Sequence, residues 1–167
     1  IDTCIFSYAI TKGMKSYGPK GILTQKTNTS KTLITCQLET IASISSKVYI
    51  ITGFGREKLY KNMRKKNSVI DIYNQNYEKH NDGHAIKLLL NTSDSDHLLV
   101  LSDGVILRLG AQDIKNKEST IFCTKLHNNW SLGCVFDKNT SMLEHIFYDV
   151  GHLSWCEAVL FGPKEID

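Results

Sequence analysis

The sequence predicts an α/β fold, in which a mainly parallel sheet with flanking helices is followed by a small antiparallel addition in the C-terminal half. Three observations favour it. Up to residue 101, short apolar runs alternate with segments of helical periodicity. The runs are continuously apolar, which is typical of parallel strands buried on both faces. After residue 104, strand-like segments follow one another across short polar turns.

The first half of the chain shows a strand, a loop and a helix, and then repeats this order. Four strands are expected, at Ile5–Ile10, Val48–Ile51, Val69–Tyr73 and Leu98–Leu101. Three helices are expected between them, one over residues 33–42 after an N-cap at Ser30 or Thr32, one over Glu57–Lys66 and one over Asp82–Leu90. This order is typical of a Rossmann-like, doubly wound sheet.

The second half is expected to contribute antiparallel strands. Strand-like segments cover Ser119–Leu126, Ser131–Asp137 and Met142–Tyr148, and the clearest turn between them is the polar segment 138–141. A chain of 167 residues buries enough surface for one core, about 70% of what the unfolded chain exposes. We therefore expect a single domain over residues 1–167.

Composition and charge exclude several classes of protein. The five cysteines are dispersed and form no C-x-x-C pair, so neither a zinc site nor a disulfide framework is expected. The net charge of +3 is mild, and the basic residues between 56 and 66 read as the solvated face of one helix, so nucleic-acid binding is not expected. The apolar stretches are far shorter than the roughly 20 residues that cross a bilayer, and no membrane association is expected.

The beginning of the chain bears on location. Ile1-Asp2-Thr3 is not a basic segment that precedes a long apolar run, so it does not resemble a secretory signal. We therefore expect a cytoplasmic protein. The chain is rich in Asn, Lys and Ile, as proteins of AT-rich genomes are, so a location within a viral or phage particle is the alternative.

Three loops are candidates for a ligand site, because ligands of an open α/β sheet bind beyond the carboxyl ends of its strands. These loops cover residues 11–23, 53–56 and 102–104. The first loop combines three lysines with three glycines, a composition that suits phosphate binding. It matches neither G-x-x-x-x-G-K-[ST] nor G-x-G-x-x-G, so an ordinary solvated loop stays an equal alternative.

Five segments, taken in chain order, are similar to motifs of one enzyme family. They are Gly18–Leu23 (a "P-K" and aliphatic pair), Lys31–Glu39 ("K-T-L-I-x-x-Q-L-E"), Asp71–Asp82 ("Y-N-P-x-Y-x-x-T-N"), Leu98–Leu107 ("L-V-L-x-G-D-V-L-F") and Trp155–Glu157 ("W-x-E"). The family that they resemble is the nucleotidyltransferases, which join a nucleoside triphosphate to a sugar phosphate or to phosphocholine.

The resemblance implies a Mg²⁺-dependent reaction in which a phosphate oxygen of the acceptor attacks the α-phosphorus of a nucleoside triphosphate and releases pyrophosphate. It implies that residues 1–104 form a nucleotide-binding half and residues 105–167 an acceptor-side half. Lys20 and Asp103 would be catalytic, and Asp103 and Glu157 would hold Mg²⁺. The nucleotide-binding residues would be Gly13, Lys15, Gly18, Lys20 and Gly53.

Two departures from the family pattern fall on residues that carry the chemistry. The signature arginine is replaced by Gly13, or in other alignments by Lys12 or Lys15, which lack a planar fork for phosphate. The family order Gly-Asp is reversed to Asp103-Gly104, and a shift of one residue on an extended segment turns a side chain to the opposite face. We therefore expect weak or no activity. The alternative is a catalytically silent binding or structural module with protein partners or as a homo-oligomer, for instance a subunit of a viral or phage assembly.

Overall fold

The computed structural model describes residues 1–25, 28–63, 68–79, 81–114, 118–125, 132–148, 151 and 153–166. Its strands are β1 (Asp2–Ser7), β2 (Thr24–Gln25), β3 (Asn28–Thr32), β4 (Lys47–Thr52), β5 (Ile70–Tyr73), β6 (Leu98–Ser102), β7 (Thr120–Lys125), β8 (Leu132–Phe136), β9 (Leu143–Tyr148) and β10 (Leu153–Phe161). Its helices are η1 (Lys20–Ile22, a 3₁₀ turn), α1 (Leu33–Ile41), α2 (Arg56–Asn62), α3 (Asp82–Leu90), α4 (Ala111–Ile114) and α5 (Pro163–Ile166).

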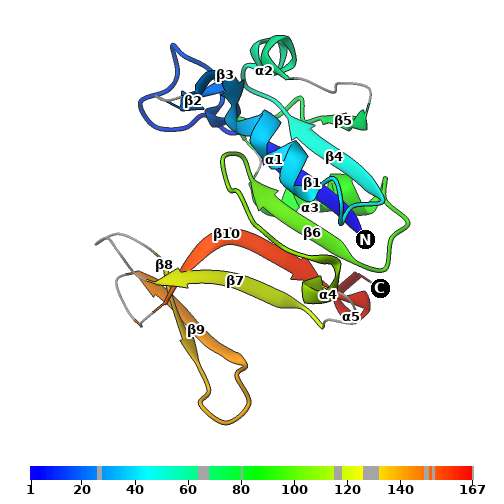
Figure 1. The fold of residues 1–167 in the computed structure, drawn as a ribbon, viewed down its shortest axis with the longest axis vertical. Coiled ribbons are helices and arrows are strands. Elements are labelled where there is room, and N and C mark those ends of the chain that lie inside the picture. The colour runs from blue at the N-terminus through cyan, green and yellow to red at the C-terminus, as the bar shows by residue number, and fades with distance from the viewer. Residues whose placement is uncertain are drawn as a thin grey trace.

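One sheet organises the described part of the chain (Figure 1). Its order is β5-β4-β1-β6-β10-β8-β9, and β7 pairs with β10 outside this path. Strands β5, β4, β1 and β6 are parallel, which confirms the predicted parallel sheet. Strand β1 lies between β4 and β6, so the strand order reverses there and the carboxyl ends of β1 and β6 mark the expected ligand position.

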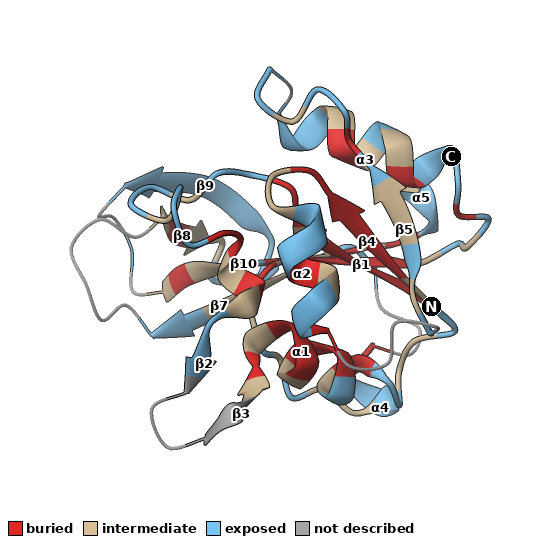
Figure 2. Ribbon diagram, turned by 90° about the horizontal axis from the view of Figure 1, so that it is seen from above, coloured by how far each residue is buried: buried red, intermediate tan, exposed pale blue. Residues whose placement is uncertain are grey.

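The core has two layers, one on each face of the sheet (Figure 2). Helices α1, α2 and α4 cover one face, where Ile34, Leu38 and Leu59 pack against the inward residues of β1, β4 and β6. Helix α3 covers the other face with Ala85 and Leu89. Because both faces are covered, the central strands are apolar in continuous runs, as the sequence predicted.

The predicted elements of the first half are present with small shifts at their ends. Strand β1 covers Asp2–Ser7, so it ends three residues earlier than the predicted strand Ile5–Ile10. The pairing of β1 ends at Ser7, which lies opposite Thr52 at the end of β4. The apolar residues that follow Ser7 therefore lie beyond the strand. Helix α3 has the predicted bounds, and Thr32 is the N-cap of α1, where its side chain accepts a hydrogen bond from the backbone N–H of Thr35. Helix α2 ends at Asn62 and its C-cap Met63 is extended, so the predicted helix Glu57–Lys66 was too long at this end; residues 64–66 lie outside the described residues.

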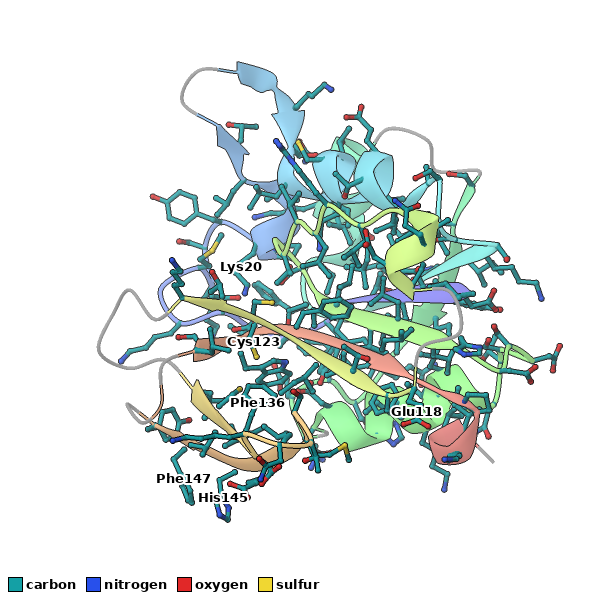
Figure 3. All side chains as sticks on the ribbon, turned by 60° about the horizontal axis from the view of Figure 1, so that its bottom comes forward. Lys20, Glu118, Cys123, Phe136, His145 and Phe147 are labelled. Atoms are coloured by element: carbon teal, nitrogen blue, oxygen red, sulfur yellow. The ribbon has the colours of Figure 1, made fainter. Side chains whose placement is uncertain are left out.

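The C-terminal half adds the predicted antiparallel strands to the same sheet. Strands β7, β8 and β9 match the predicted segments, whose ends at residues 126 and 131 lie outside the described residues. The sequence did not predict that β10 is a nine-residue strand, or that it runs antiparallel to β6 beside the parallel strands. All six residues of β9 are exposed, and His145 and Phe147 project outward from the β8–β9 hairpin (Figure 3).

Two further features concern the polar segments and the helices. The β2–β3 hairpin was not predicted, because its residues are nearly all polar and show no apolar alternation. Among the described residues, no helix has the length and the apolar character needed to cross a membrane.

Candidate functional site

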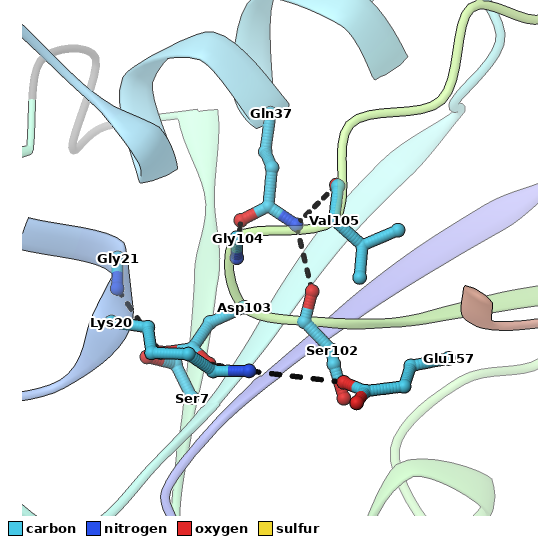
Figure 4. A network of polar contacts seen from close by, with 9 residues as sticks. All are labelled: Ser7, Lys20, Gly21, Gln37, Ser102, Asp103, Gly104, Val105 and Glu157. Atoms are coloured by element: carbon cyan, nitrogen blue, oxygen red, sulfur yellow. Dashed lines mark hydrogen bonds and ion pairs between the residues drawn. The ribbon is translucent and has the colours of Figure 1, made fainter. Parts of the chain in front are cut away.

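Three charged side chains meet at the carboxyl ends of β1 and β6. Lys20 comes from η1 in the loop after β1, Asp103 follows β6, and Glu157 lies within β10. The Lys20 Nζ lies 3.9 Å from the Asp103 Oδ1 and 3.8 Å from the Glu157 Oε2. Figure 4 shows the lysine side chain extended between the two carboxylates. The fold therefore brings together three of the site residues that the sequence predicted.

Asp103 is buried and held in one orientation. The residue as a whole is only 7% exposed. The Oδ2 accepts hydrogen bonds from the Ser7 hydroxyl at 3.0 Å and from the Gly21 backbone N–H at 3.1 Å. Burial raises the pKa of this carboxyl group, and the Gly21 N–H and the Lys20 ammonium partly oppose the rise. Asp103 thus points toward Lys20, although the reversed Asp-Gly order had left open that it faces away.

The turn that carries Asp103 is fixed by a buried amide from α1. The Gln37 Nε2 donates to the carbonyl oxygens of Ser102 at 2.9 Å and of Val105 at 2.7 Å. The Gln37 Oε1 accepts from the backbone N–H of Gly104 at 2.9 Å. Gly104 has a φ of 87°, a left-handed conformation that favours glycine. Gln37 therefore holds both sides of the Asp103 turn (Figure 4).

Glu157 reaches the site because β10 is irregular at this point. The register between β10 and β7 shifts between Trp155 and Val159, and Glu157 has a φ of 55°. The Trp155 indole N–H donates to the Ala158 carbonyl oxygen at 3.1 Å and closes the bulge. A left-handed backbone at a residue with a Cβ costs about 1–2 kcal/mol. The bulge redirects the carboxylate toward Lys20, as bulges beside functional sites often do.

The other predicted nucleotide-binding residues lie apart from this cluster. Lys20, Asp103 and Glu157 line an open pocket of about 320 Å³. Lys15, Gly18 and Gly53 line another pocket, of about 440 Å³, together with Arg56 at the start of α2 and Tyr73 at the end of β5. Its walls combine glycines and basic side chains with two aromatic rings and the carboxylate of Glu57.

The two glycines Gly13 and Gly53 differ in what surrounds them. Gly13 is exposed with a φ of 81°, and a Cβ there would face open space. At Gly53 a Cβ would lie 2.7 Å from the Tyr77 Cβ and 2.9 Å from the Tyr8 carbonyl oxygen. Close packing against the tyrosines therefore explains why position 53 has no side chain.

The donor set at the cluster suits a Mg²⁺ ion that arrives with phosphates. Within the described residues, no group of three or more His, Cys, Asp and Glu side chains is arranged to hold a metal ion. Mg²⁺ usually binds through one or two carboxylates together with substrate phosphates and water. The Oδ1 of Asp103 and the carboxylate of Glu157 both face one point, where the Lys20 ammonium now lies. These two residues fit the ion that the resemblance implies.

Sequence reasoning did not assign roles to Ser7, Gly21 and Gln37, which position the predicted residues. One signal could have revealed Gln37. It is a polar residue on the apolar face of α1 between Ile34 and Leu38, and a buried amide at such a position must have hydrogen-bond partners. Ser7 gives no comparable signal, because a small hydroxyl at a strand end is common.

The fold and the position of the site define an α/β domain with a mainly parallel sheet and a charged cluster at the carboxyl ends of β1 and β6. The sequence matches no known protein family, and it matches none of the curated proteins. Among solved structures, it is similar to CTP:phosphocholine cytidylyltransferase from Streptococcus pneumoniae, with a TM-score of 0.73 and 16% identity over 99% of this chain and 72% of that one.

Two other similar structures have the same type of fold. A UDP-glucose pyrophosphorylase complexed with UDP-glucose has a TM-score of 0.70 and 13% identity, over 99% of this chain and 78% of its own. The inositol-1-phosphate CTP transferase from T. maritima has a TM-score of 0.71 and 12% identity, over 99% and 71%. At these identities the similarity establishes the fold.

Proposed function

We propose that this chain binds a nucleoside triphosphate with Mg²⁺ and transfers its nucleotidyl group slowly to a small phosphorylated acceptor, with release of pyrophosphate. The observation that carries the proposal is the convergence of the Lys20 ammonium with the Asp103 and Glu157 carboxylates at the point where the strand order reverses. A phosphate-binding cation beside carboxylates that suit Mg²⁺ is the minimum that such a transfer requires.

Each residue has a role in this scheme. Bound Mg²⁺ would neutralise charge on the triphosphate. Asp103, oriented by Ser7 and Gly21, would present its Oδ1 to the ion, and Glu157 would add a second carboxylate. The Lys20 ammonium would then leave its two carboxylate partners and contact a phosphate oxygen. In this scheme residues 1–104 supply the nucleotide side and β10 supplies part of the acceptor side.

The rate should be low because the signature arginine is replaced. Lys12, Gly13 and Lys15, the residues that could stand in its place, are all exposed. None of them offers a planar fork to a phosphate, since a lysine contacts it as a point charge. Removal of one charged contact to a transition state typically costs a factor of about 10²–10³ in rate.

A catalytically silent binding module is the second candidate. The observation that favours it is that Lys20 lies within 4 Å of both carboxylates, at 3.9 and 3.8 Å, and so already neutralises part of their charge without a metal ion. In that case the domain would bind a nucleotide, or a protein partner or second copy within a larger assembly such as a viral or phage particle, without turnover.

A titration with nucleoside triphosphates, with and without Mg²⁺, tests the proposed function. Calorimetry on the unmodified chain should give nucleotide binding that Mg²⁺ strengthens markedly. Lys20→Ala should weaken it about tenfold or more, because a charge-assisted phosphate contact contributes roughly 1.5–3 kcal/mol. Lys164→Ala, which removes a lysine whose side chain is 80% exposed, is the matched control and should bind normally. Equal affinity in the Lys20→Ala variant would remove Lys20 from the site.

A further inference from the structure

The loop after β1 is tied to helix α2 by the side chain of Lys58. Its Nζ donates hydrogen bonds to the backbone carbonyl oxygens of Ser16 and Tyr17, at 3.1 Å each. Among the described residues, the other hydrogen bonds of residues 11–18 join members of this loop to one another. Lys58 is therefore the hydrogen-bonded tether between the loop over residues 11–18 and the rest of the described structure.

The segment that Lys58 holds lies between two glycines with a positive φ. The angle is 81° at Gly13 and 126° at Gly18. Glycine reaches such angles without a steric penalty, and it has more conformational freedom to lose than any other residue. The backbone at the two ends of the segment therefore does not by itself select one position for it, and a contact from outside the loop is needed to do so.

Helix α2 also packs against the end of the loop that leads to Lys20. A Cβ on Gly18 would lie 3.2 Å from the Lys58 Cδ, so the lysine stem covers this glycine. A Cβ on Gly55 would lie 2.6 Å from the Pro19 Cδ, so the residue before α2 packs directly on the proline. Lys20 follows Pro19 and begins η1. Contacts from α2 and its N-cap thus extend to the residue that precedes Lys20.

We propose that Lys58 is a positioning residue of the nucleotide site, which fixes the loop over residues 11–18 and thereby the place at which Lys20 meets a phosphate. The inference rests on the proposed function, because it concerns the loop of the same site. Lys58 acts through the loop, since both of its hydrogen bonds go to loop carbonyl groups. It lines the pocket of Lys15 and Gly18, whereas Lys20 lines the pocket of Asp103.

Titration of the four common nucleoside triphosphates with Mg²⁺ into three variants tests the inference. Lys58→Met keeps the stem without the ammonium group and should weaken binding about fivefold or more. Lys58→Arg should restore it, because a guanidinium group can donate to both carbonyl oxygens. Lys61→Met, the matched control, removes an exposed lysine from the same helix and should bind normally. Unchanged affinity in Lys58→Met, or an equal loss in Lys61→Met, would overturn the inference.

A double variant separates positioning from direct contact with the nucleotide. In a chain that already carries Lys20→Ala, the further change Lys58→Met should alter the affinity by less than about twofold, because the side chain that Lys58 positions is gone. A full additional loss in that background would mean that Lys58 acts independently of Lys20, and would overturn the positioning role.

Limited digestion with trypsin tests the tether without any nucleotide. Trypsin cleaves after lysine, and Lys12 and Lys15 are exposed in the loop that Lys58 holds. Cleavage after them should be several-fold faster in Lys58→Met than in the unmodified chain or in Lys61→Met, because the released loop opens more often. The Tm should change little, since water replaces the lost hydrogen bonds at this exposed position. Equal cleavage rates would contradict the tether.

The two experiments together separate this inference from the proposed function. If a nucleotide binds with Mg²⁺ and Lys58→Met changes neither its affinity nor the cleavage rate, the proposed function stands and the positioning inference fails. If Lys58→Met is cleaved faster while the unmodified chain binds no nucleotide, the tether stands and the proposed function fails.

Discussion

Replacement of Gln37 by methionine tests whether this amide positions Asp103. The substitution keeps the length of the side chain and removes three hydrogen bonds of 2.7–2.9 Å to the backbone of residues 102–105. Gln37 is fully buried, so the released backbone groups gain no water in exchange. At about 1 kcal/mol for each hydrogen bond, the free energy of unfolding should fall by roughly 3 kcal/mol. For a domain of this size that corresponds to a decrease in Tm of about 6–12 °C.

Two measurements on the folded variant separate positioning from stability alone. At a temperature where Gln37→Met is still folded, its affinity for Mg²⁺ and nucleotide together should fall, because the Asp103 turn has lost its anchor. Its affinity for nucleotide without Mg²⁺ should change little.

The matched control for Gln37→Met is Glu39→Gln. Glu39 lies on the same helix as Gln37 and forms a surface ion pair with Lys31, whose side chain is 39% exposed while that of Glu39 is 40% exposed. The substitution removes this pair and should lower the free energy of unfolding by less than about 1 kcal/mol. A Gln37→Met variant with unchanged Tm and unchanged Mg²⁺ dependence would refute the positioning argument.

Further predictions concern the two carboxylates. The folded-state pKa of Asp103 is raised above its ordinary value of 3.8, so its contribution to stability is present below that value and is lost as pH rises through the folded pKa. Asp103→Asn should therefore unfold at a higher temperature than the unmodified chain at neutral pH, in a thermal scan across the acid range, and the difference should disappear at low pH. Exchange of Asp103 and Gly104 should abolish Mg²⁺-dependent binding, because Asp103 already faces Lys20 and position 104 has a φ of 87°; improved binding in that calorimetric titration would contradict the geometry. Glu157→Gly should relieve the strained backbone and leave thermal stability equal or higher by about 1 kcal/mol, while Mg²⁺ affinity falls; a marked loss of stability would show that the bulge depends on the side chain.

The sequence predicted those parts of the fold that rest on local pattern. The parallel strands were found because each is a continuous apolar run, such as Leu98–Leu101. Strand β10 was missed because Ser154 and Glu157 interrupt its apolar pattern. The bulge that accommodates Glu157 forms only where β10 pairs with β7 and β6. Register shifts depend on tertiary pairing, which no local pattern encodes.

The sequence nominated the charged residues of the candidate site. It gave no role to Ser7, Gly21 and Gln37, which hold Asp103 and its turn in place. Lys20, Asp103 and Glu157 came from family-like motifs. The direction of Asp103 was left open because it depends on Ser7 and Gly21, which are distant in sequence and converge only in the fold. The expected grouping of Lys15, Gly18 and Gly53 with Lys20 also depended on how the loop after β1 folds, and the loop places them in a different pocket.

Pyrophosphate release tests the central proposal most directly. The unmodified chain would be incubated with the common nucleoside triphosphates, Mg²⁺ and a panel of sugar phosphates with phosphocholine, beside an Asp103→Asn variant under the same conditions. The account predicts slow release that requires Mg²⁺ and an acceptor and that falls to background in Asp103→Asn. Release at background from the unmodified chain despite nucleotide binding, or release that Asp103→Asn leaves unchanged, would contradict it.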